Sequence, residues 1–135
     1  MRDIIAGIEL FNKTDFFAAH DFFEDCWLDC EREDRFFYQG LVQISVGFYH
    51  LISGNVKGSL SQLKKGIKKL KIYGDVYRHV NLKLLIEQVS SVILDLSDSQ
   101  KQIELIKLWN KIPRIETINK FSNYSGGRNG NNDNR

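Results

Sequence analysis

Cysteine, proline and long hydrophobic runs are scarce in this sequence, and each scarcity excludes a class of protein. Two cysteines in 135 residues are too few to hold a small secreted domain together by disulfides. A single proline excludes a collagen-like chain. No apolar run approaches the ~18 residues that a membrane-spanning helix requires. Apolar residues nevertheless make up 42% of the chain and charged residues 27%, which is typical of one soluble globular domain.

The two cysteines, Cys26 and Cys30, are four residues apart in a segment that we predict to be helical. Side chains on one helix rarely meet the geometry of a disulfide, so we expect two reduced thiols in a reducing compartment. The first ten residues lack the basic start, long apolar stretch and small-residue cleavage site of a secretion signal. We therefore expect a soluble intracellular protein that works where it is made.

The formal net charge of +2 is too small to indicate a nucleic-acid or membrane partner by itself. The charges are nevertheless separated, because residues 15–34 are strongly acidic and residues 57–83 strongly basic. We interpret these segments as solvated helix faces that neutralise each other within one fold. RNA binding through the lysines from Lys64 to Lys71 is an alternative. No arginine-rich stretch or aromatic stacking platform accompanies them, so we expect no nucleic-acid partner.

Apolar residues recur with the 3.6-residue period of an α-helix throughout the chain, and no useful length alternates with the period of a strand. Short connections make consecutive helices antiparallel neighbours. The expected fold is therefore all-α, a bundle of antiparallel helical hairpins with about five to six helices. We place one domain at residues 1–122, a loop at 72–81 within it, and a disordered Gly/Asn-rich tail at 123–135. The helices are predicted at residues 2–11, 16–30, 36–53, 56–71 and 82–96, with a short sixth helix that extends to Trp109.

A polar stripe interrupts the apolar side of the second predicted helix. His20, Glu24 and Trp27 lie within about 60° of one another at 100° per residue, on the side that we expect to face the core. Burying an imidazole and a carboxylate without partners would cost several kcal/mol. Each group therefore needs a hydrogen bond or a pocket. A carboxylate one turn from an imidazole can orient it and hold its proton, which suits a metal ligand pair or an acid/base pair.

The third predicted helix carries a matching stripe of small and polar residues. Glycine inside a helix costs roughly 1 kcal/mol relative to alanine, and close approach of a neighbouring helix is the natural reason for it. If the second and third helices form a hairpin, this stripe would face His20, Glu24 and Trp27. The residues of the stripe are Gly40, Gln43, Gly47 and His50.

Two interpretations of this polar cluster stay open. In the first, a buried network of His, Glu and Gln only fixes the register of two helices. In the second, the cluster is a site for a ligand or substrate, and His20, Glu24 and His50 are a plausible ligand set for one divalent transition metal. The candidate ligand-binding residues are His20, Glu24, Trp27, Gln43 and His50.

Three pairs of adjacent phenylalanines give a separate indication of function. Neighbouring residues on a helix point about 100° apart, so both members of each pair cannot face one core. A multilayer bundle would bury both members, whereas an exposed phenylalanine patch would favour a protein partner or a homodimer. The pairs are Phe16/Phe17, Phe22/Phe23 and Phe36/Phe37.

The segment from Phe11 to Trp27 contains the spacing His-x-x-x-Glu-x-x-Trp and resembles the family catalogued as domain of unknown function 309. The resemblance continues through residues 38–43, 49–51 and 54–58, and it covers roughly residues 8–71. Asp21 stands where the family usually has Glu, and its side chain has a shorter reach. At a second position Ser59 replaces the usual alanine.

The resemblance implies an all-α fold similar to tetratricopeptide-type hairpins, in a family found in bacteria, archaea and some algal plastid genomes. The abundance of Ile, Lys and Asn in this chain agrees with a plastid-encoded or bacterial origin, and a plastid-encoded protein would work in the chloroplast stroma. No established activity comes with the family name. We therefore expect a binding or scaffolding module with a buried His/Glu cluster. The alternative is a metal-dependent or acid/base enzyme centred on His20, Glu24 and His50.

Overall fold

Residues with short polar side chains set where the helices begin. The side chains of Asp3, Asp15, Asn55 and Asn81 each accept a hydrogen bond from a backbone N–H in the first turn that follows, which satisfies a donor that the helix leaves unpaired. Gly54 adopts a φ of +84° directly after the third helix, a conformation that glycine takes at little cost. The ends of the first five predicted helices are confirmed to within two residues.

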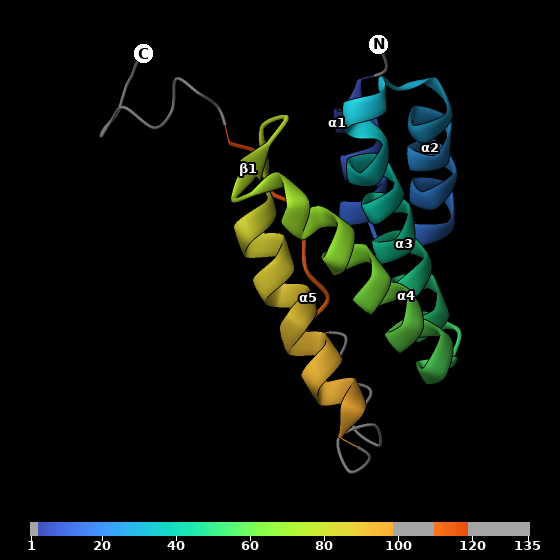
Figure 1. Cartoon of the computed structure of the whole chain (residues 1–135). Coiled ribbons are helices and arrows are strands. Elements are labelled where there is room, and N and C mark those ends of the chain that lie inside the picture. Colours follow the sequence, from blue (N-terminus) through green and yellow to red (C-terminus); the bar gives the residue numbers. More distant parts are fainter. Residues whose placement is uncertain (1–2, 99–109, 119–135) are drawn as a thin grey trace, which may run out of the picture.

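The computed structural model of the chain describes residues 3–98 and 110–118, and in this part the fold is all-α, as predicted (Figure 1). The helices are α1 (Ile4–Asn12), α2 (Phe16–Asp29), α3 (Arg35–Ile52), α4 (Val56–Leu70) and α5 (Leu82–Ser97). The short elements are the 3₁₀-helices η1 (Arg32–Asp34) and η2 (Lys71–Tyr73) and the strands β1 (Val76–Tyr77) and β2 (Val80–Asn81).

Helix α3 lies between α2 and α4 and packs antiparallel to both. Phe16, at the start of α2, packs its ring on Phe48 near the end of α3. Toward α4, a Cβ added at Gly40 would meet Leu70, and one added at Gly47 would meet Leu63. The expectation that the glycine stripe faces the second helix is therefore wrong. The glycines face α4, because α2 covers the side of α3 that carries Phe48.

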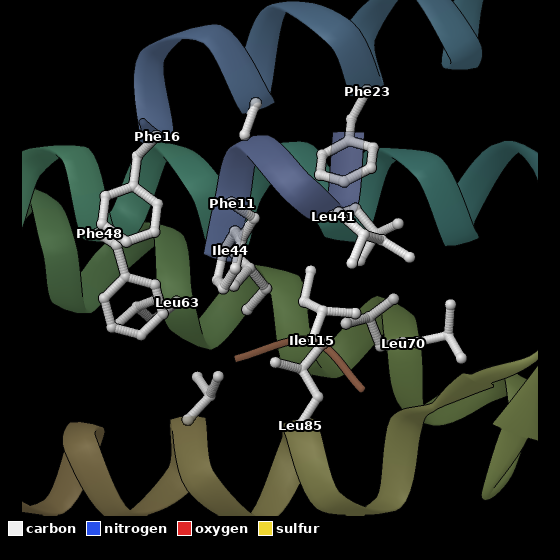
Figure 2. Packing of buried hydrophobic residues seen from close by; sticks show 14 of the residues in the cluster. Phe11, Phe16, Phe23, Leu41, Ile44, Phe48, Leu63, Leu70, Leu85 and Ile115 are labelled. Atoms are coloured by element: carbon white, nitrogen blue, oxygen red, sulfur yellow. The ribbon is translucent and has the colours of Figure 1, made fainter. Parts of the chain in front are cut away.

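The core fills the space between all five helices. Figure 2 shows Phe16, Phe48 and Leu63 packed near one another, with Leu85 of α5 closing the opposite side. Rings of α1, α2 and α3 meet directly, since Phe11 contacts both Phe16 and Phe48 with centroids 5.0 and 5.9 Å apart. These edge-to-face contacts fix the relative positions of the first three helices.

The predicted loop at residues 72–81 contains regular structure that the sequence analysis missed. Strands β1 and β2 pair antiparallel with Tyr77 opposite Val80. The two turn residues, Arg78 and His79, have φ values of 48° and 66°. Two-residue hairpin turns with positive φ usually contain Asn or Gly. Because Arg and His occupy this turn, the sequence does not predict the hairpin.

Residues 110–118 return to the N-terminal half of the molecule. The buried side chain of Ile115 belongs to the core. Asn12 at the end of α1 accepts a hydrogen bond from the backbone N–H of Ile115 and donates one to its carbonyl. Thr117 bridges to Val80 of β2. The predicted sixth helix, the tail at 123–135 and the boundary at residue 122 lie outside the described residues.

Within residues 3–98 and 110–118, no helix is both long and apolar enough to cross a membrane.

The contact between α3 and α4 depends on the small size of Gly66. A Cβ at this position would lie 2.7 Å from Cδ1 of Ile44 and 3.0 Å from the carbonyl oxygen of Gly40. Gly66→Ala gains about 1 kcal/mol of helix propensity, but overpacking against backbone costs about 1–3 kcal/mol. We expect a net loss of about 1 kcal/mol in urea unfolding followed by circular dichroism. The exposed control Ser61→Ala should change stability by less than about 0.5 kcal/mol. A more stable Gly66→Ala protein would contradict the close contact.

Candidate functional site

The core-facing side of α2 consists of Phe16, Ala19, Phe23 and Cys26. His20, Glu24 and Trp27 lie roughly 90° around the helix from this side, at 100° per residue. Accordingly Glu24 is exposed, and His20 and Trp27 are half-buried. The expectation of a buried His/Glu cluster is therefore wrong, because the apolar residues of α2 occupy the core side and leave the polar stripe at its margin.

The imidazole of His20 is held in one orientation. Its Nδ1 lies 2.5 Å from the carbonyl oxygen of Phe17. Because a carbonyl can only accept, Nδ1 carries the proton and Nε2 is the nitrogen that keeps a lone pair in the neutral ring. Nε2 lies 4.0 Å from Oδ1 of Asp21. One donor atom each from His20, Asp21 and Glu24 lies within 4.8 Å of the other two.

Four rings form a continuous series over the α2–α3 surface, and we call this series the aromatic arc. His20 contacts Phe17 with centroids 5.0 Å apart, Phe17 contacts Tyr49 at 5.7 Å, and Tyr49 contacts His50 at 6.3 Å. Phe17 is 55% exposed and Tyr49 is 40% exposed. The arc is therefore a surface feature that contains both candidate histidines, one at each end.

The phenylalanine pairs divide between core and surface. Phe16 and Phe37 are buried, whereas Phe17 and Phe36 are each more than half exposed. Two of the three pairs thus place a phenylalanine in solvent, and the alternative of a bundle that buries every ring does not hold for them.

The other candidate residues point elsewhere. Gln43 accepts a hydrogen bond from Nζ of Lys69 on α4 at 3.0 Å. Trp27 lies under the Arg35 guanidinium, 5.5 Å from the ring centroid, and its Nε1 has no hydrogen-bond partner among the described residues. His50 is 3.5 Å from the side-chain amide of Asn55. The structure brings together His20 and Glu24 and adds Asp21; His50 is not in that group of donor atoms.

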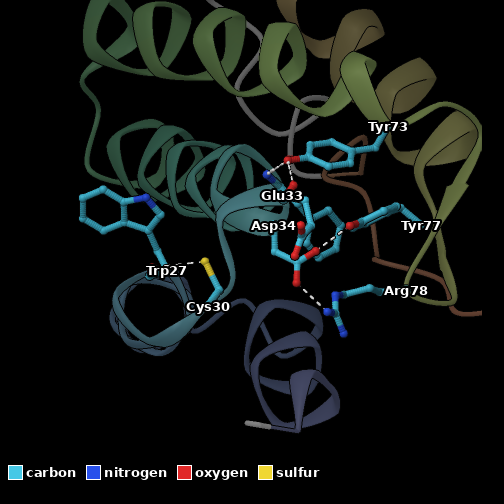
Figure 3. A network of polar contacts seen from close by, with 8 residues as sticks. Trp27, Cys30, Glu33, Asp34, Tyr73, Tyr77 and Arg78 are labelled. Carbon is cyan, nitrogen blue, oxygen red and sulfur yellow. Dashed lines mark hydrogen bonds and ion pairs between the residues drawn. The ribbon is translucent and has the colours of Figure 1, made fainter.

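A second polar cluster surrounds Asp34 at the other end of α2 (Figure 3). The Asp34 carboxylate is buried and accepts hydrogen bonds from the hydroxyl of Tyr77 and the guanidinium of Arg78. Tyr73 donates to the carbonyl of Glu33 at 2.7 Å and accepts from the backbone N–H of Phe37 at 3.0 Å. The cluster fastens the β1–β2 hairpin to the start of α3. The sequence gives no sign that Asp34 is buried, because every residue from 31 to 35 is charged.

Burial and hydrogen bonding act in opposite directions on Asp34. Burial raises the pKa of its carboxyl, but the hydrogen bonds from Arg78 and Tyr77 and the positive charge of Arg78 outweigh burial, so the pKa is lowered overall. The same hydrogen bond to Asp34, together with burial, raises the pKa of Tyr77 to about 12. At neutral pH the cluster is therefore a carboxylate held by a neutral phenol and a guanidinium.

A cavity of about 260 Å³ adjoins this cluster, and the two cysteines line it with Asp34, Tyr38 and Arg78. Cys26 and Cys30 are not joined by a disulfide, as expected from their spacing. Burial, and then the charge of Asp34, raises the pKa of the Cys30 thiol. Cys30 is therefore a neutral thiol at neutral pH, which makes it a weak nucleophile.

Comparison with protein families gives a match over residues 4–62 to a domain of unknown function, DUF309. The match supports the predicted resemblance of this part of the chain to the DUF309 family. The match extends from α1 into α4 and so contains the aromatic arc, His20, Glu24 and Asp34. Tyr77 and Arg78 lie beyond the end of the DUF309 match. Comparison with curated proteins gives no match to the chain.

Removing the charge of Asp34 should destabilise the protein in a pH-dependent way. Asp34→Asn removes the negative charge that binds the Arg78 guanidinium and the Tyr77 hydroxyl, and we expect a loss of about 3 kcal/mol in the free energy of unfolding at pH 7. Because the folded-state pKa of Asp34 is lowered, its stabilisation is present above the unfolded pKa of about 3.9 and is lost as the pH falls through the folded value. Urea unfolding at several pH values should therefore show the difference shrinking below about pH 4.

The neighbouring carboxylate of Glu33 provides the control for this measurement, since its side chain is exposed. Glu33→Gln should unfold like the wild type across the same pH range. A difference between wild type and Asp34→Asn that does not depend on pH would show that the ionised carboxylate is not what holds the hairpin.

Proposed function

We propose that this DUF309-containing chain is a protein-binding module that docks an apolar, positively charged segment of a partner on the aromatic arc. The observation that carries the proposal is the exposure of Phe17, whose ring packs on the half-exposed Tyr49 instead of entering the core. Aromatic rings held in place by neighbours are the residues that most often dominate protein interfaces, because they bury much area with little loss of rotamer entropy.

The charge around the arc indicates what kind of segment would bind. Helix α2 contains four acidic residues and no lysine or arginine. Asp21 and Glu24 are exposed next to His20, at one end of the arc. A partner with lysine or arginine beside an apolar side chain would match both the rings and the carboxylates. The same negative charge disfavours nucleic acid on this face.

The enzyme alternative receives less support from the geometry. It needs His20, Glu24 and His50 around one substrate, with Gln43 donating to it. His50 instead lies at the opposite end of the arc from His20, and the Gln43 side chain is bound to Lys69 of α4. One observation does favour a metal site, because donor atoms of His20, Asp21 and Glu24 lie close together.

Selection of peptides from a random displayed library against the purified full chain tests the proposal. We expect enriched peptides to combine aliphatic or aromatic residues with Lys or Arg. Their affinity, measured by fluorescence anisotropy, should fall at least about tenfold in Phe17→Ala, because an anchoring ring typically contributes 2 kcal/mol or more. Their affinity should also fall as salt rises, since exposed charges are screened.

Phe36→Ala is the matched control, because Phe36 is 51% exposed but does not belong to the arc. Its affinity for the selected peptides should equal that of the wild type. Acidic peptides, equal losses in both variants, or no enrichment would each overturn the proposal. Analytical ultracentrifugation could instead show reversible self-association that Phe17→Ala abolishes. This result would identify a second copy of the chain as the occupant of the arc and would contradict the proposal of a basic partner segment.

A further inference from the structure

We propose that His20, Asp21 and Glu24 form a binding site for one first-row divalent transition ion on the outer face of α2. This inference does not rest on the protein-binding proposal, because the geometry of the three donor atoms carries it and the exposure of Phe17 does not. The three residues are the one group of His, Cys, Asp or Glu side chains, among residues 3–98 and 110–118, whose donor atoms gather closely enough to hold an ion.

The orientation of His20 suits a metal ligand. Its Nδ1–H is donated to the backbone carbonyl of Phe17, and its ring packs edge-on against the Phe17 ring. Histidine ligands of metals usually donate the other ring N–H to a carbonyl or carboxylate in this way, which fixes the tautomer and the direction of the lone pair. Nε2, the nitrogen that remains, is the atom that approaches Asp21.

The carboxylates lie at nearly the spacing that coordination needs. Two ligand atoms bound at about 2.1 Å in a tetrahedral site are about 3.4 Å apart. Nε2 of His20 and Oδ1 of Asp21 are 4.0 Å apart, and all three donor atoms lie within 4.8 Å of one another. The imidazole is only 22% exposed, whereas the Asp21 side chain is 68% exposed. The carboxylates are therefore free to close by the remaining ångström or so around a fixed nitrogen.

The donor types indicate which ions would bind. One imidazole nitrogen and two carboxylates favour ions such as Zn²⁺, Mn²⁺ or Fe²⁺ over soft ions that prefer thiolates. Both thiols line the cavity beside Asp34 and do not belong to this group. Three protein ligands leave at least one coordination position open for water or for a donor atom of a bound partner.

Titration of the full chain with Mn²⁺, followed by electron paramagnetic resonance of the free ion, tests the site. Mn²⁺ is the probe because it binds carboxylate and imidazole and has little affinity for thiols. We expect one equivalent to bind and to broaden the backbone amide signals of residues 17–24 in ¹H–¹⁵N spectra. His20→Ala and Glu24→Gln should each weaken binding at least about tenfold, as expected for loss of a ligand.

His50→Ala is the matched control, because His50 is a histidine of similar burial that the geometry excludes from the site. It should bind Mn²⁺ like the wild type. Glu24→Gln changes an exposed side chain and should fold normally, so the test stands even if His20→Ala is unstable. Absence of binding, broadening elsewhere in the chain, or an equal loss in His50→Ala would overturn the metal site. None of these results depends on whether the selected peptides bind.

Discussion

The position of α3 between two helices is the constraint from which the rest of this structure follows. Helix α2 covers the side of α3 that carries Phe48. On the glycine side of α3, the backbone of α4 comes into contact with that of α3, where Gly40 and Gly66 face each other. Once the core side of α2 is turned toward Phe48, the stripe that begins at His20 can only lie at the margin of the helix. The same rotation brings Phe17 next to Tyr49 in solvent. The aromatic arc is thus a consequence of how the hairpin packs.

The features that repeat along the chain could be predicted from the sequence, and those that depend on helix rotation could not. The apolar period places the five described helices to within two residues, and in the structure Asp15 and Asn55 cap the starts of α2 and α4. The assignment of the glycine stripe to the wrong neighbour came from having two candidate helices and no way to rank them. His20 and Glu24 come together because they share a helix, whereas adding His50 required a packing that Leu63 and Leu70 exclude.

Several polar contacts join the DUF309 segment to residues beyond it, and two of them centre on Asp34 and Asn12. Asp34 and Asn12 lie within residues 4–62, and their partners, which include Arg78 and Ile115, lie outside. Neither contact has a sequence signal, because a charged turn and an asparagine at a helix end are normally solvated. Each contact can be recognised only in the structure, where residues far along the chain, Arg78 and Ile115, lie beside Asp34 and Asn12. The residues that follow the match therefore supply hydrogen-bond partners to polar groups within it.

The pairing of Asn12 with Ile115 spans 103 positions, and this separation has a consequence for synthesis. A chain made from its N-terminus exposes the end of α1 long before the residue that covers it exists. Phe11 and its neighbours must therefore remain partly open to water while most of the protein is translated. Contacts of such long range also slow the final folding step, because a large loop closes before it gains any compensating contact. The core is therefore completed by Ile115, in the last segment of the chain that the structure describes.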